Sequence, residues 1–599
     1  MSTTAVSPIA GAAGGSFLLE SRTSEEIFTP EDLSEEQLQI AATAEQFARD
    51  EILPRAAAIE AKEPGVLESV LRKAAELGFT AVDIPEEYGG LGMDKISSAV
   101  VTDHISVLAS FSTAFGAHIG IATLPLVWYG TEEQKRRYLP KLVSCEWIGA
   151  YGLSEASSGS DAMNIRTRAT LSPNGAHYIL NGEKQWLTNG GIASLYTVFA
   201  KIDGEKFSAF LIERGTPGLT VGAEEHKLGI RGSSTCPLVL QDCKIPRENL
   251  LGEIGKGHHI AFNVLNVGRL KLGIACIGGA RNAVAHMIRY AKERHAFGKA
   301  IAEFGLIQRK ISAAAARLYA AESMAYRTAG LMDAKLTRLA TDHPNQAVDV
   351  PRAIGDYAVE CSILKVFGSE MLSLVTDELI ATMGGYGYVQ EYPAERLYRD
   401  ARINRIFEGT NEINRLIITG WLMKQAMNGK LPLLPAIKRV MDEVTAPPSF
   451  NNGPDSTEPL AREASVLAAV KKTALFAAGV ASQRFMTGLE EQQEVMADLA
   501  DMIIHVFALE SALLRARKIT ATGRNSAEAA SAMTGLLADE SLALAEHAAR
   551  RVIAACAEGD ALQMQLAILR RLARFNPTDV VRLSRTVAKH AITAERYLL

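Results

Sequence analysis

The chain has 599 residues, of which 48% are hydrophobic and 22% charged, and its formal net charge is −5. This balance is typical of a folded globular protein and excludes a disordered chain, a collagen-like fibre and a small disulfide scaffold, while so small a charge gives no general attraction to nucleic acid. At roughly 150 residues per domain, the length corresponds to about four domains.

The first half of the chain predicts helices followed by a small sheet. Residues 1–30 form an N-terminal tail rich in small residues, and amphipathic helical stretches follow over 31–148. Over 149–256 the segments become short and alternating, and two of them flank Asn174-Gly175, a dipeptide typical of β-hairpins. We therefore expect a central antiparallel β domain, and the sequence leaves open whether it is a barrel or a sandwich.

The second half predicts two helical blocks with a linker between them. Helical periodicity resumes over 257–427, where we expect a helical bundle. Residues 428–465 contain several prolines and predict a linker rather than packed structure. Residues 466–599 predict a second, alanine-rich helical domain, in which apolar residues from Met496 to Leu513 recur three and four apart and form one helix face. The predicted fold class is therefore mainly α with a central antiparallel β domain. The sequence does not show the alternating strands and helices of a Rossmann dehydrogenase, so that class of enzyme is disfavoured.

Cysteine usage and the N-terminus bear on location. The six cysteines are scattered, with no Cys-x-x-Cys pair and no cluster with histidine, so we expect neither a metal site nor disulfides. The first 22 residues lack the basic start and apolar stretch of a signal peptide, and no run of about 18 uninterrupted apolar residues predicts a spanning helix. We expect a cytoplasmic protein, unless a peripheral contact holds it at a membrane.

Glu408 is the candidate general base. It follows Ile406 and Phe407 and precedes Gly409. A carboxylate among bulky apolar residues loses solvation, which raises its pKa toward the range useful for a base. Gly409 permits close approach of a ligand, and Thr410 places a hydroxyl near a predicted helix start. Taken alone, the segment is as well explained by a solvent-exposed glutamate before a helix.

Four further segments contain residues suited to a flat ring or a phosphate. Residues 150–161 are rich in serine and glycine, and Trp186 and Thr188 lie on the same face of a predicted strand. Arg294 suits a phosphate and Phe297 an aromatic ring, and a glycine-rich turn spans 383–388. Each segment alone also fits an ordinary loop, a core tryptophan or a helix end.

Together, in this order and at these separations, the five segments resemble the acyl-CoA dehydrogenase family. The resemblance covers residues 30–427 almost continuously, and the tail after 428 is similar to that of very-long-chain acyl-CoA dehydrogenases and bacterial fatty-acid-oxidation counterparts. It implies a helical domain, a β domain and a four-helix bundle, with an extra C-terminal helical domain. It also implies FAD-dependent oxidation of fatty acyl-CoA to trans-2-enoyl-CoA, the first step of fatty acid β-oxidation, with electrons passed to an electron-transfer flavoprotein.

The resemblance implies a role for each matching residue. Glu408 matches the base that removes the α-proton, and Gly268 stands at the alternative base position of the family. The residues that match cofactor-binding positions are Tyr151, Leu153, Ser154, Ser160, Trp186, Thr188, Arg294, Phe297, Met383, Gly384, Gly385, Thr410 and Glu412. Those that match substrate-binding positions are Ser160, Asn266, Arg269, Phe407 and Gly409.

The resemblance also bears on assembly and on substrate length. Arg294, Phe297 and the segment 383–385 match residues that reach the FAD of a neighbouring subunit, which implies a homodimer. Family members with a C-terminal tail are dimers, whose tail covers the surface used for tetramer assembly. In the helix that matches the pocket floor, Gly116, Ala117 and Gly120 leave room for a long or very long acyl chain. His118, in the same helix, is more simply a hydrogen-bonded core histidine.

Two alternative functions and one further partner remain open. An acyl-CoA oxidase would pass electrons to oxygen, and a non-enzymatic assembly or scaffold protein would reuse the fold, although retention of Glu408 disfavours the scaffold. Residues 431–441 mix apolar side chains with two cations, which suits a peripheral membrane contact through 430–460. A solvated linker packed lightly on the C-terminal block is the simpler alternative for that segment.

Overall fold

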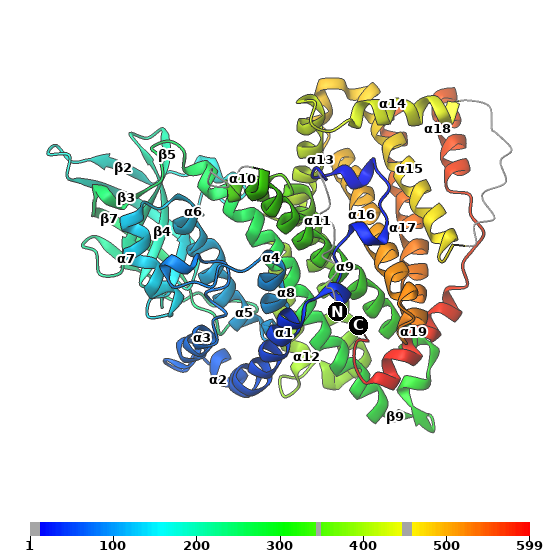
Figure 1. Ribbon diagram of the computed structural model, residues 1–599, viewed down its shortest axis with the longest axis horizontal. Coiled ribbons are helices and arrows are strands. Elements are labelled where there is room, and N and C mark those ends of the chain that lie inside the picture. Colours follow the sequence, from blue (N-terminus) through cyan, green and yellow to red (C-terminus); the bar gives the residue numbers. More distant parts are fainter. Residues whose placement is uncertain (1–11, 343–348, 446–457, 599) are drawn as a thin grey trace.

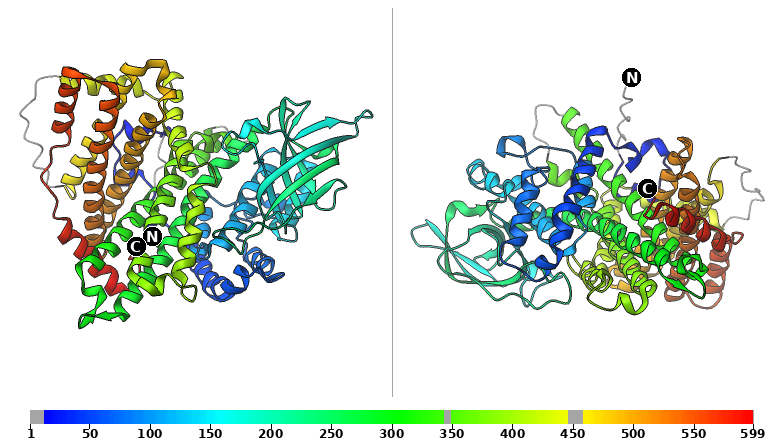
Figure 2. Two further views of the ribbon diagram at one scale, coloured as in Figure 1. Left: turned by 180° about the vertical axis from the view of Figure 1, so that it is seen from behind. Right: turned by 90° about the horizontal axis from the view of Figure 1, so that it is seen from below.

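We describe a computed structural model of the chain, and it covers residues 12–342, 349–445 and 458–598. The elements follow one another in space from the β domain at one end, through a central helical bundle, to the C-terminal helices at the other (Figures 1 and 2). The predicted fold class, mainly α with a central β domain, is confirmed.

The N-terminal domain is helical. Its helices are α1 (Glu35–Phe47), α2 (Ala56–Glu60), α3 (Val66–Glu76), α4 (Lys95–Ile105), α5 (Ala109–Gly116), α6 (Leu124–Tyr129) and α7 (Glu132–Val143). Reciprocal capping fixes where α1 and α7 begin, because Ser34 exchanges hydrogen bonds with Gln37, and Thr131 with Gln134. A π-helical turn over Ala117–Ala122 joins α5 to α6.

The β domain is one twisted, mostly antiparallel sheet. Its strands are β1 (Gly149–Gly152), β2 (Arg168–Leu171), β3 (His177–Thr188), β4 (Leu195–Ile202), β5 (Lys206–Glu213), β6 (Leu219–Val221), β7 (Thr235–Pro246) and β8 (Leu250–Leu251). The sheet order is β6-β7-β3-β2-β4-β5-β8, and β1 pairs with β4 in parallel. The hairpin predicted at Asn174-Gly175 is confirmed, since it joins β2 to β3 with Gly175 at φ 68°.

The central bundle is built from four long helices. These are α8 (Gly257–Glu293), α9 (Gly305–Asp342), α11 (Ala358–Met383) and α13 (Asn411–Met427); α10 (Val350–Gly355), α12 (Pro393–Ala401) and a short hairpin of β9 (His295–Ala296) and β10 (Lys299–Ala300) connect them. A Cβ on Gly278 of α8 would lie 2.1 Å from the carbonyl oxygen of Asp103 in α4. Glycine there lets the N-terminal domain pack directly on the bundle.

Five helices form a C-terminal block against the bundle, at the right of Figure 1. They are α15 (Ala461–Phe485), α16 (Gln493–Ala521), α17 (Ala527–Cys556), α18 (Gly559–Leu572) and α19 (Val580–Ala594). The apolar face predicted from Met496 to Leu513 is buried. Ions are buried with it: the fully buried guanidinium of Arg515 on α16 lies 2.9 Å from Glu31 and 2.6 Å from Glu322 of the bundle.

The prediction of an unpacked linker over 428–465 is wrong for its first part. Residues Leu433–Thr445 form helix α14, which packs on α15. Leu433, Ala436, Val440 and Val444 recur three and four residues apart and are buried, so they form one apolar helix face. Pro435 lies in the first turn, where a missing N–H costs little. Pro447, Pro448 and Pro454 lie outside the described residues.

The predicted N-terminal tail is also packed where the structure describes it. Phe17 and Leu18 are buried, and the Phe17 ring centroid lies 4.7 Å from that of Phe507 in α16. The backbone N–H of Gly15 donates to the buried carboxylate of Glu360 in α11, at 2.7 Å. These contacts join the start of the chain to both the bundle and the C-terminal block.

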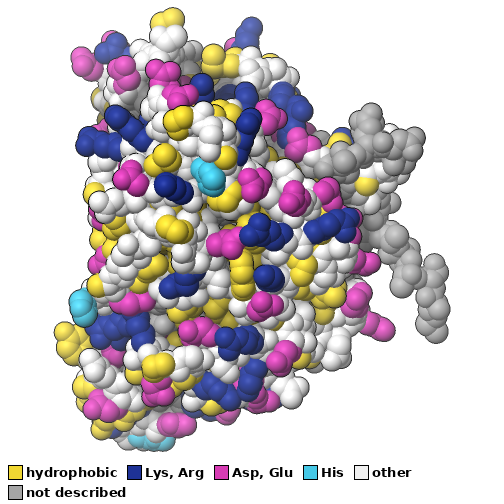
Figure 3. All heavy atoms as spheres, turned by 90° about the vertical axis from the view of Figure 1, so that its left-hand side faces the viewer, with side chains coloured by type: hydrophobic (Ala, Val, Ile, Leu, Met, Phe, Trp, Pro, Cys, Tyr) yellow, Lys and Arg dark blue, Asp and Glu magenta, His cyan; other side chains and the backbone are white. Residues whose placement is uncertain are grey.

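Three helical segments are long and apolar enough to cross a membrane, by length and composition alone. They are Ala109–Tyr129, Gly257–Glu293 and Ala461–Glu491. Most of each apolar window, 67% or more, is buried inside the protein, so packing within the fold accounts for the composition. On the face that carries the β domain, acidic, basic and hydrophobic side chains are intermixed (Figure 3).

Candidate functional site

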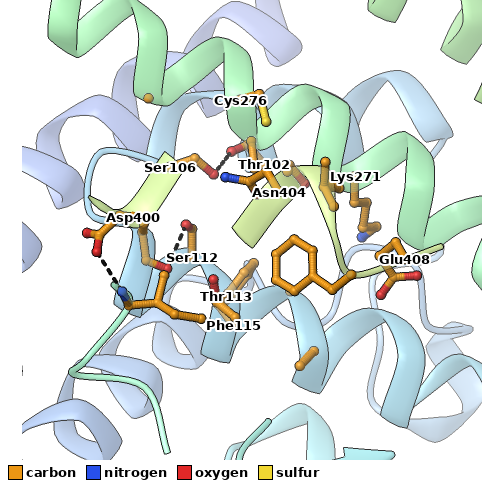
Figure 4. Close-up of a pocket in the computed structure, with 18 of the residues that line it drawn as sticks. Thr102, Ser106, Ser112, Thr113, Phe115, Lys271, Cys276, Asp400, Asn404 and Glu408 are labelled. Carbon is orange, nitrogen blue, oxygen red and sulfur yellow. Dashed lines mark hydrogen bonds between the residues drawn. The ribbon is translucent and has the colours of Figure 1, made fainter. Parts of the chain in front are cut away.

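A deep pocket lies where the N-terminal helices, the β domain and the bundle meet. It is open at its mouth, and the space between atoms, including that open mouth, is about 1070 Å³. Its wall comes mainly from α4, α5, the π-helical turn, α8 and α12, with Thr188 from β3. Glu408 and Asp400 lie on opposite sides of the pocket, with Thr113 and Phe115 between them (Figure 4). Small and apolar side chains dominate the wall, which suits an aliphatic ligand.

Glu408 is held in a strained turn that aims its carboxylate at α8. It has φ 57° and is followed by Gly409 at φ 82°, in the loop between the turn Arg402–Arg405 and α13. A Cβ on Gly268 of α8 would lie 2.5 Å from Oε2 of Glu408. That oxygen is buried and has no hydrogen-bond partner among the described residues. The absence of a side chain at Gly268 therefore makes the space in which the carboxylate lies.

Burial sets the protonation of Glu408. Loss of solvation raises the pKa of the carboxyl to about 7, although Arg269 and Lys365 act in the opposite direction. A carboxylate with a pKa near neutrality can take a proton at physiological pH, which is the property expected of a general base. The predicted base thus lies in the pocket with an unpaired oxygen and a raised pKa.

Three polar side chains hold the loop that carries Glu408. The Asn414 amide donates to the carbonyls of Gly409 and Thr410, at 2.8 and 3.0 Å. The buried ammonium of Lys365 donates to the Gly409 carbonyl at 2.7 Å, and the guanidinium of Arg269 donates to the Glu408 carbonyl at 3.3 Å. Left-handed backbone costs free energy, so these bonds fix a conformation that the chain would otherwise avoid.

Sequence reasoning missed Lys365 and Asn414 altogether. A signal for Lys365 exists, because it is the single charge in the run Ile363-Leu364-Lys365-Val366-Phe367, and a charge in a buried helix must be paired. Arg269 and Asn266, predicted to approach the substrate, bond to each other at 3.0 Å beside the Glu408 loop. The structure gives Arg269 a positioning contact, and the substrate contact of both residues stays a prediction.

The residues predicted to face a flavin ring lie next to this end of the pocket. Thr188 lines the pocket together with Glu408 and Phe407. The Tyr151 hydroxyl is buried without a partner among the described residues, and burial, with the Glu408 charge, raises its pKa well above the ordinary value. Trp186, at φ 63° beside a bulge in β3, exposes 58% of its surface. An orphaned hydroxyl and an exposed indole ring fit a bound aromatic ring system.

Other predicted cofactor residues are spread around that region. Leu153 is buried and Ser160 is exposed in the loop after β1, while the Ser154 carbonyl accepts from Gln185 at 2.9 Å. Thr410 caps α13 by accepting from the backbone of Ile413, and Glu412 lies in the first turn of that helix. These residues do not line the deep pocket with Glu408, so their cofactor contacts stay predictions.

A second group of predicted residues lies apart from Glu408. Arg294, Met383, Gly384 and Gly385 line an open hollow at the end of α8 and α11 that shares no residue with the deep pocket. Phe297, at the tip of the β9–β10 hairpin, is 96% exposed. One chain therefore does not bring these residues to its own Glu408, as expected if they serve another subunit.

The pocket floor agrees with the reading of its small residues. Gly116, Ala117 and Gly120 line the pocket, and a Cβ on Gly116 would meet nothing within 4 Å. His118 points into the core instead: its Nε2 lies 2.9 Å from the Leu142 carbonyl oxygen, and its Nδ1 accepts from the Gly149 N–H at 3.0 Å. Within the described residues, no group of three His, Cys, Asp or Glu side chains has the arrangement of a metal site.

Comparison with family models identifies four matching regions. Residues 34–146 match the N-terminal domain of acyl-CoA dehydrogenase, 150–243 its middle domain and 255–423 its C-terminal domain. Residues 469–571 match a further model, also described as an acyl-CoA dehydrogenase C-terminal domain. These four regions together span most of the chain.

Similar proteins cover the same range. The chain is 45% identical over 585 residues, 98% of either sequence, to a probable acyl-CoA dehydrogenase of Bacillus subtilis. It is 40% identical over 363 residues to the human very long-chain specific acyl-CoA dehydrogenase, covering 59% of this chain and 53% of that one. A crystal structure of an acyl-CoA dehydrogenase complexed with FAD, from Bacillus anthracis, superposes with a TM-score of 0.95 at 44% identity, covering 98% of this chain and all of that one.

Proposed function

The chain belongs to the acyl-CoA dehydrogenase family and is an FAD-dependent oxidoreductase of fatty acid oxidation, and from that premise we propose that it oxidises long- or very-long-chain acyl-CoA to trans-2-enoyl-CoA and passes the electrons to an electron-transfer flavoprotein. The observation that carries the catalytic part is the buried Glu408 carboxylate, which faces Gly268 in the deep pocket with its pKa raised to about 7.

Glu408 is the residue that moves a proton. Its unpaired Oε2 accepts the α-proton of the thioester, while Arg269, Asn414 and Lys365 hold the loop so that the carboxylate keeps its direction. Bound FAD would supply the acceptor for the β-hydrogen and its electron pair. Tyr151, Trp186 and Thr188 would hold its ring beside the pocket, and the apolar wall keeps water from the reacting carbons.

Replacing the base tests the assignment. Glu408→Gln keeps the size of the side chain but removes the proton acceptor, so flavin bleaching by palmitoyl-CoA should slow by roughly 10²–10⁴-fold. The protein should stay yellow and should still bind acyl-CoA, as measured by anaerobic absorbance titration. Glu253→Gln, an exposed glutamate before α8, is the matched control. Normal bleaching of the Glu408→Gln protein would refute the assignment.

The preference for long chains rests on the pocket rather than on the base. Gly116 and Gly120 leave the wall open, and the pocket continues from Glu408 to Thr102, Ser106 and Gly279, on α4 and α8. Comparing kcat/KM for butyryl-, octanoyl- and palmitoyl-CoA tests this reading. A preference for butyryl-CoA would overturn it.

The electron acceptor is tested separately. An acyl-CoA oxidase would consume oxygen in step with substrate, whereas a dehydrogenase would reduce an electron-transfer flavoprotein and react slowly with oxygen. An oxygen electrode with purified protein and palmitoyl-CoA distinguishes the two. A colourless protein unable to rebind FAD would instead favour a non-enzymatic scaffold.

We also propose that the functional unit is a homodimer. Arg294 and Met383–Gly385 lie away from Glu408 of their own chain, around a hollow that is also lined by exposed apolar side chains. These are Tyr386, Val389 and Tyr392, which expose 48%, 41% and 37% of their surface. Exposed apolar side chains gathered in this way are typical of an interface. A partner subunit covering this surface would bring these residues to its own flavin site.

We also propose that the protein is cytoplasmic. A cytoplasmic protein agrees with six cysteines that are all free thiols. The peripheral membrane contact considered for 430–460 has weaker support, because α14 turns its apolar face inward and leaves only Leu434 largely exposed among its large hydrophobic residues. Flotation with anionic liposomes, compared between wild type and Leu434→Ser, measures any contribution of that residue.

A further inference from the structure

A second apolar cavity lies in the C-terminal half, between α13, α14, α15 and α16. The space between atoms, including the solvent-filled mouth, is about 710 Å³. Among its lining residues only Thr419 and Ser482 are polar, and the Thr419 hydroxyl already donates to the Arg415 carbonyl within its own helix, at 3.2 Å. A wall of this kind offers almost nothing to a polar ligand and excludes it by the cost of desolvation.

This cavity is distinct from the catalytic pocket. The two share no lining residue, and Glu408 belongs only to the first. The helices that enclose the cavity are also different, because α14, α15 and α16 contribute nothing to the wall of the catalytic pocket. A ligand in this cavity would therefore be bound without being oxidised.

The mouth of the cavity combines apolar and cationic side chains. Met427 and Leu434 belong to the wall yet expose 80% and 57% of their surface, so they form its rim. Lys424 precedes Met427 by three residues on α13, and Lys438 follows Leu434 by four on α14, spacings that put each lysine beside a rim residue. Both lysines are exposed. An apolar interior with cations at its rim fits a chain that ends in an anionic head.

Methionines make the wall adaptable. Met423 and Met496 line the interior together with Leu475, and unbranched thioether side chains adjust to ligands of different length. We propose that this cavity binds a monomeric long-chain fatty acid, with its hydrocarbon chain inside and its carboxylate at Lys424 and Lys438. This binding site is additional to the catalytic site and does not rest on the proposed reaction.

Filling the cavity tests the proposal. Ala478 on α15 lines the cavity, and Ala478→Phe would occupy the space of the chain. Palmitate below its micelle concentration is titrated calorimetrically into the full-length holoprotein. Ala478→Phe should weaken this binding at least tenfold, while oxidation of octanoyl-CoA stays unchanged. Gly116→Leu, which narrows the catalytic pocket, is the matched control and should leave palmitate binding at the second site intact.

Two further arms make the outcome decisive. Lys424→Gln with Lys438→Gln should weaken palmitate severalfold and leave neutral hexadecanol unaffected. If Ala478→Phe fails to fold by circular dichroism, Ala478→Leu replaces it. Palmitate affinity unchanged by filling the cavity overturns the proposal. A second result would also overturn it: wild type does not bind monomeric palmitate, but it co-floats with phosphatidylglycerol vesicles and Ala478→Phe does not. The ligand of the cavity would then be a membrane lipid.

Discussion

The reactivity that we propose for Glu408 depends on single residues around it. Gly268 leaves room for the carboxylate, whose Oε2 is buried without a hydrogen-bond partner among the described residues, and this burial raises the pKa of the acid. The cations Arg269 and Lys365 bind backbone carbonyls of the loop instead of the carboxylate itself. They therefore fix the position of the proposed base and lower its pKa only in part. A direct salt bridge would have kept Glu408 ionised and weakened it as a base.

The first prediction concerns pH. With the pKa of Glu408 raised to about 7, kcat/KM for palmitoyl-CoA should rise with pH up to about 7 and level off above it. A pH profile on a fixed substrate measures this. The folded protein holds the carboxyl proton up to a higher pH than the unfolded chain does. The stabilisation from the protonated carboxyl is therefore fully present below the pKa of the unfolded state, and it is lost as the pH rises through 7. Glu408→Gln should therefore gain thermal stability relative to wild type as pH rises from 5 to 8. A constant difference would contradict this.

The second prediction concerns Gly268. In Gly268→Ala the new Cβ would lie 2.5 Å from Oε2 of Glu408, so the carboxylate must move away. Because a misplacement of about 1 Å can cost about 10²-fold in rate, flavin reduction should slow by at least that factor while bound FAD is retained. Stopped-flow absorbance measures it. Gly420→Ala on α13, where a Cβ would meet nothing within 4 Å, is the control and should react normally.

At the scale of elements, the sequence predicted what local patterns determine. The hairpin at Asn174-Gly175 and the buried face from Met496 to Leu513 follow from turn chemistry and periodicity, and both are confirmed. The linker prediction gave too much weight to prolines, since Pro435 is harmless in the first turn of α14. Lys365 escaped notice because its partners, the Gly409 carbonyl and Asn411, are 44 and 46 positions away in the chain. Contacts of that kind follow from tertiary packing, which one sequence does not show.

The third prediction belongs to the helix α5. Gly116→Leu would place a side chain in the open space of the acyl pocket, where glycine leaves at least 4 Å clear. The kcat/KM for palmitoyl-CoA should fall at least tenfold. The kcat/KM for butyryl-CoA should change less than threefold, because a short acyl chain does not extend to the part of the pocket that Gly116→Leu narrows. Steady-state assays with both substrates measure the ratio. An equal loss for both would show that the residue acts on the base or the flavin instead.

For the whole molecule, buried ions fasten the C-terminal block to the rest. Arg515 joins Glu31 near the N-terminus and Glu322 of α9, and Arg281 of α8 joins Glu322 and Asp103 of α4. These contacts connect three parts of the chain through one network. Its ions are costly to bury unless every member is paired, so the network specifies a single docking geometry.

The fourth prediction follows from that network. Arg515→Met leaves Glu31 and Glu322 buried without their shared cation, which should cost about 3–5 kcal/mol of unfolding free energy. Arg551→Met is the matched control, because Arg551 pairs with Asp498 at the surface, where such a pair is worth about 0–1 kcal/mol. Chemical denaturation followed by circular dichroism compares the two. Equal losses would mean that the buried network does not hold the block in place.

The fifth prediction joins the surplus length to assembly. Helices α15–α19 cover the faces of α9 and α13 on the bundle, whereas the hollow around Arg294 and Gly384, at the end of α8 and α11, stays open. One face of the bundle is occupied by the chain's own C-terminal block, and one aromatic surface is exposed. Such a chain should form a dimer and no larger assembly. Twice 64.5 kDa gives a dimer of about 129 kDa in light scattering coupled to size exclusion. Tyr386→Lys should shift it toward monomer and weaken FAD retention together, because Tyr386 lines the hollow that would carry the partner's cofactor residues. A tetramer would remove the blocking role from the C-terminal helices.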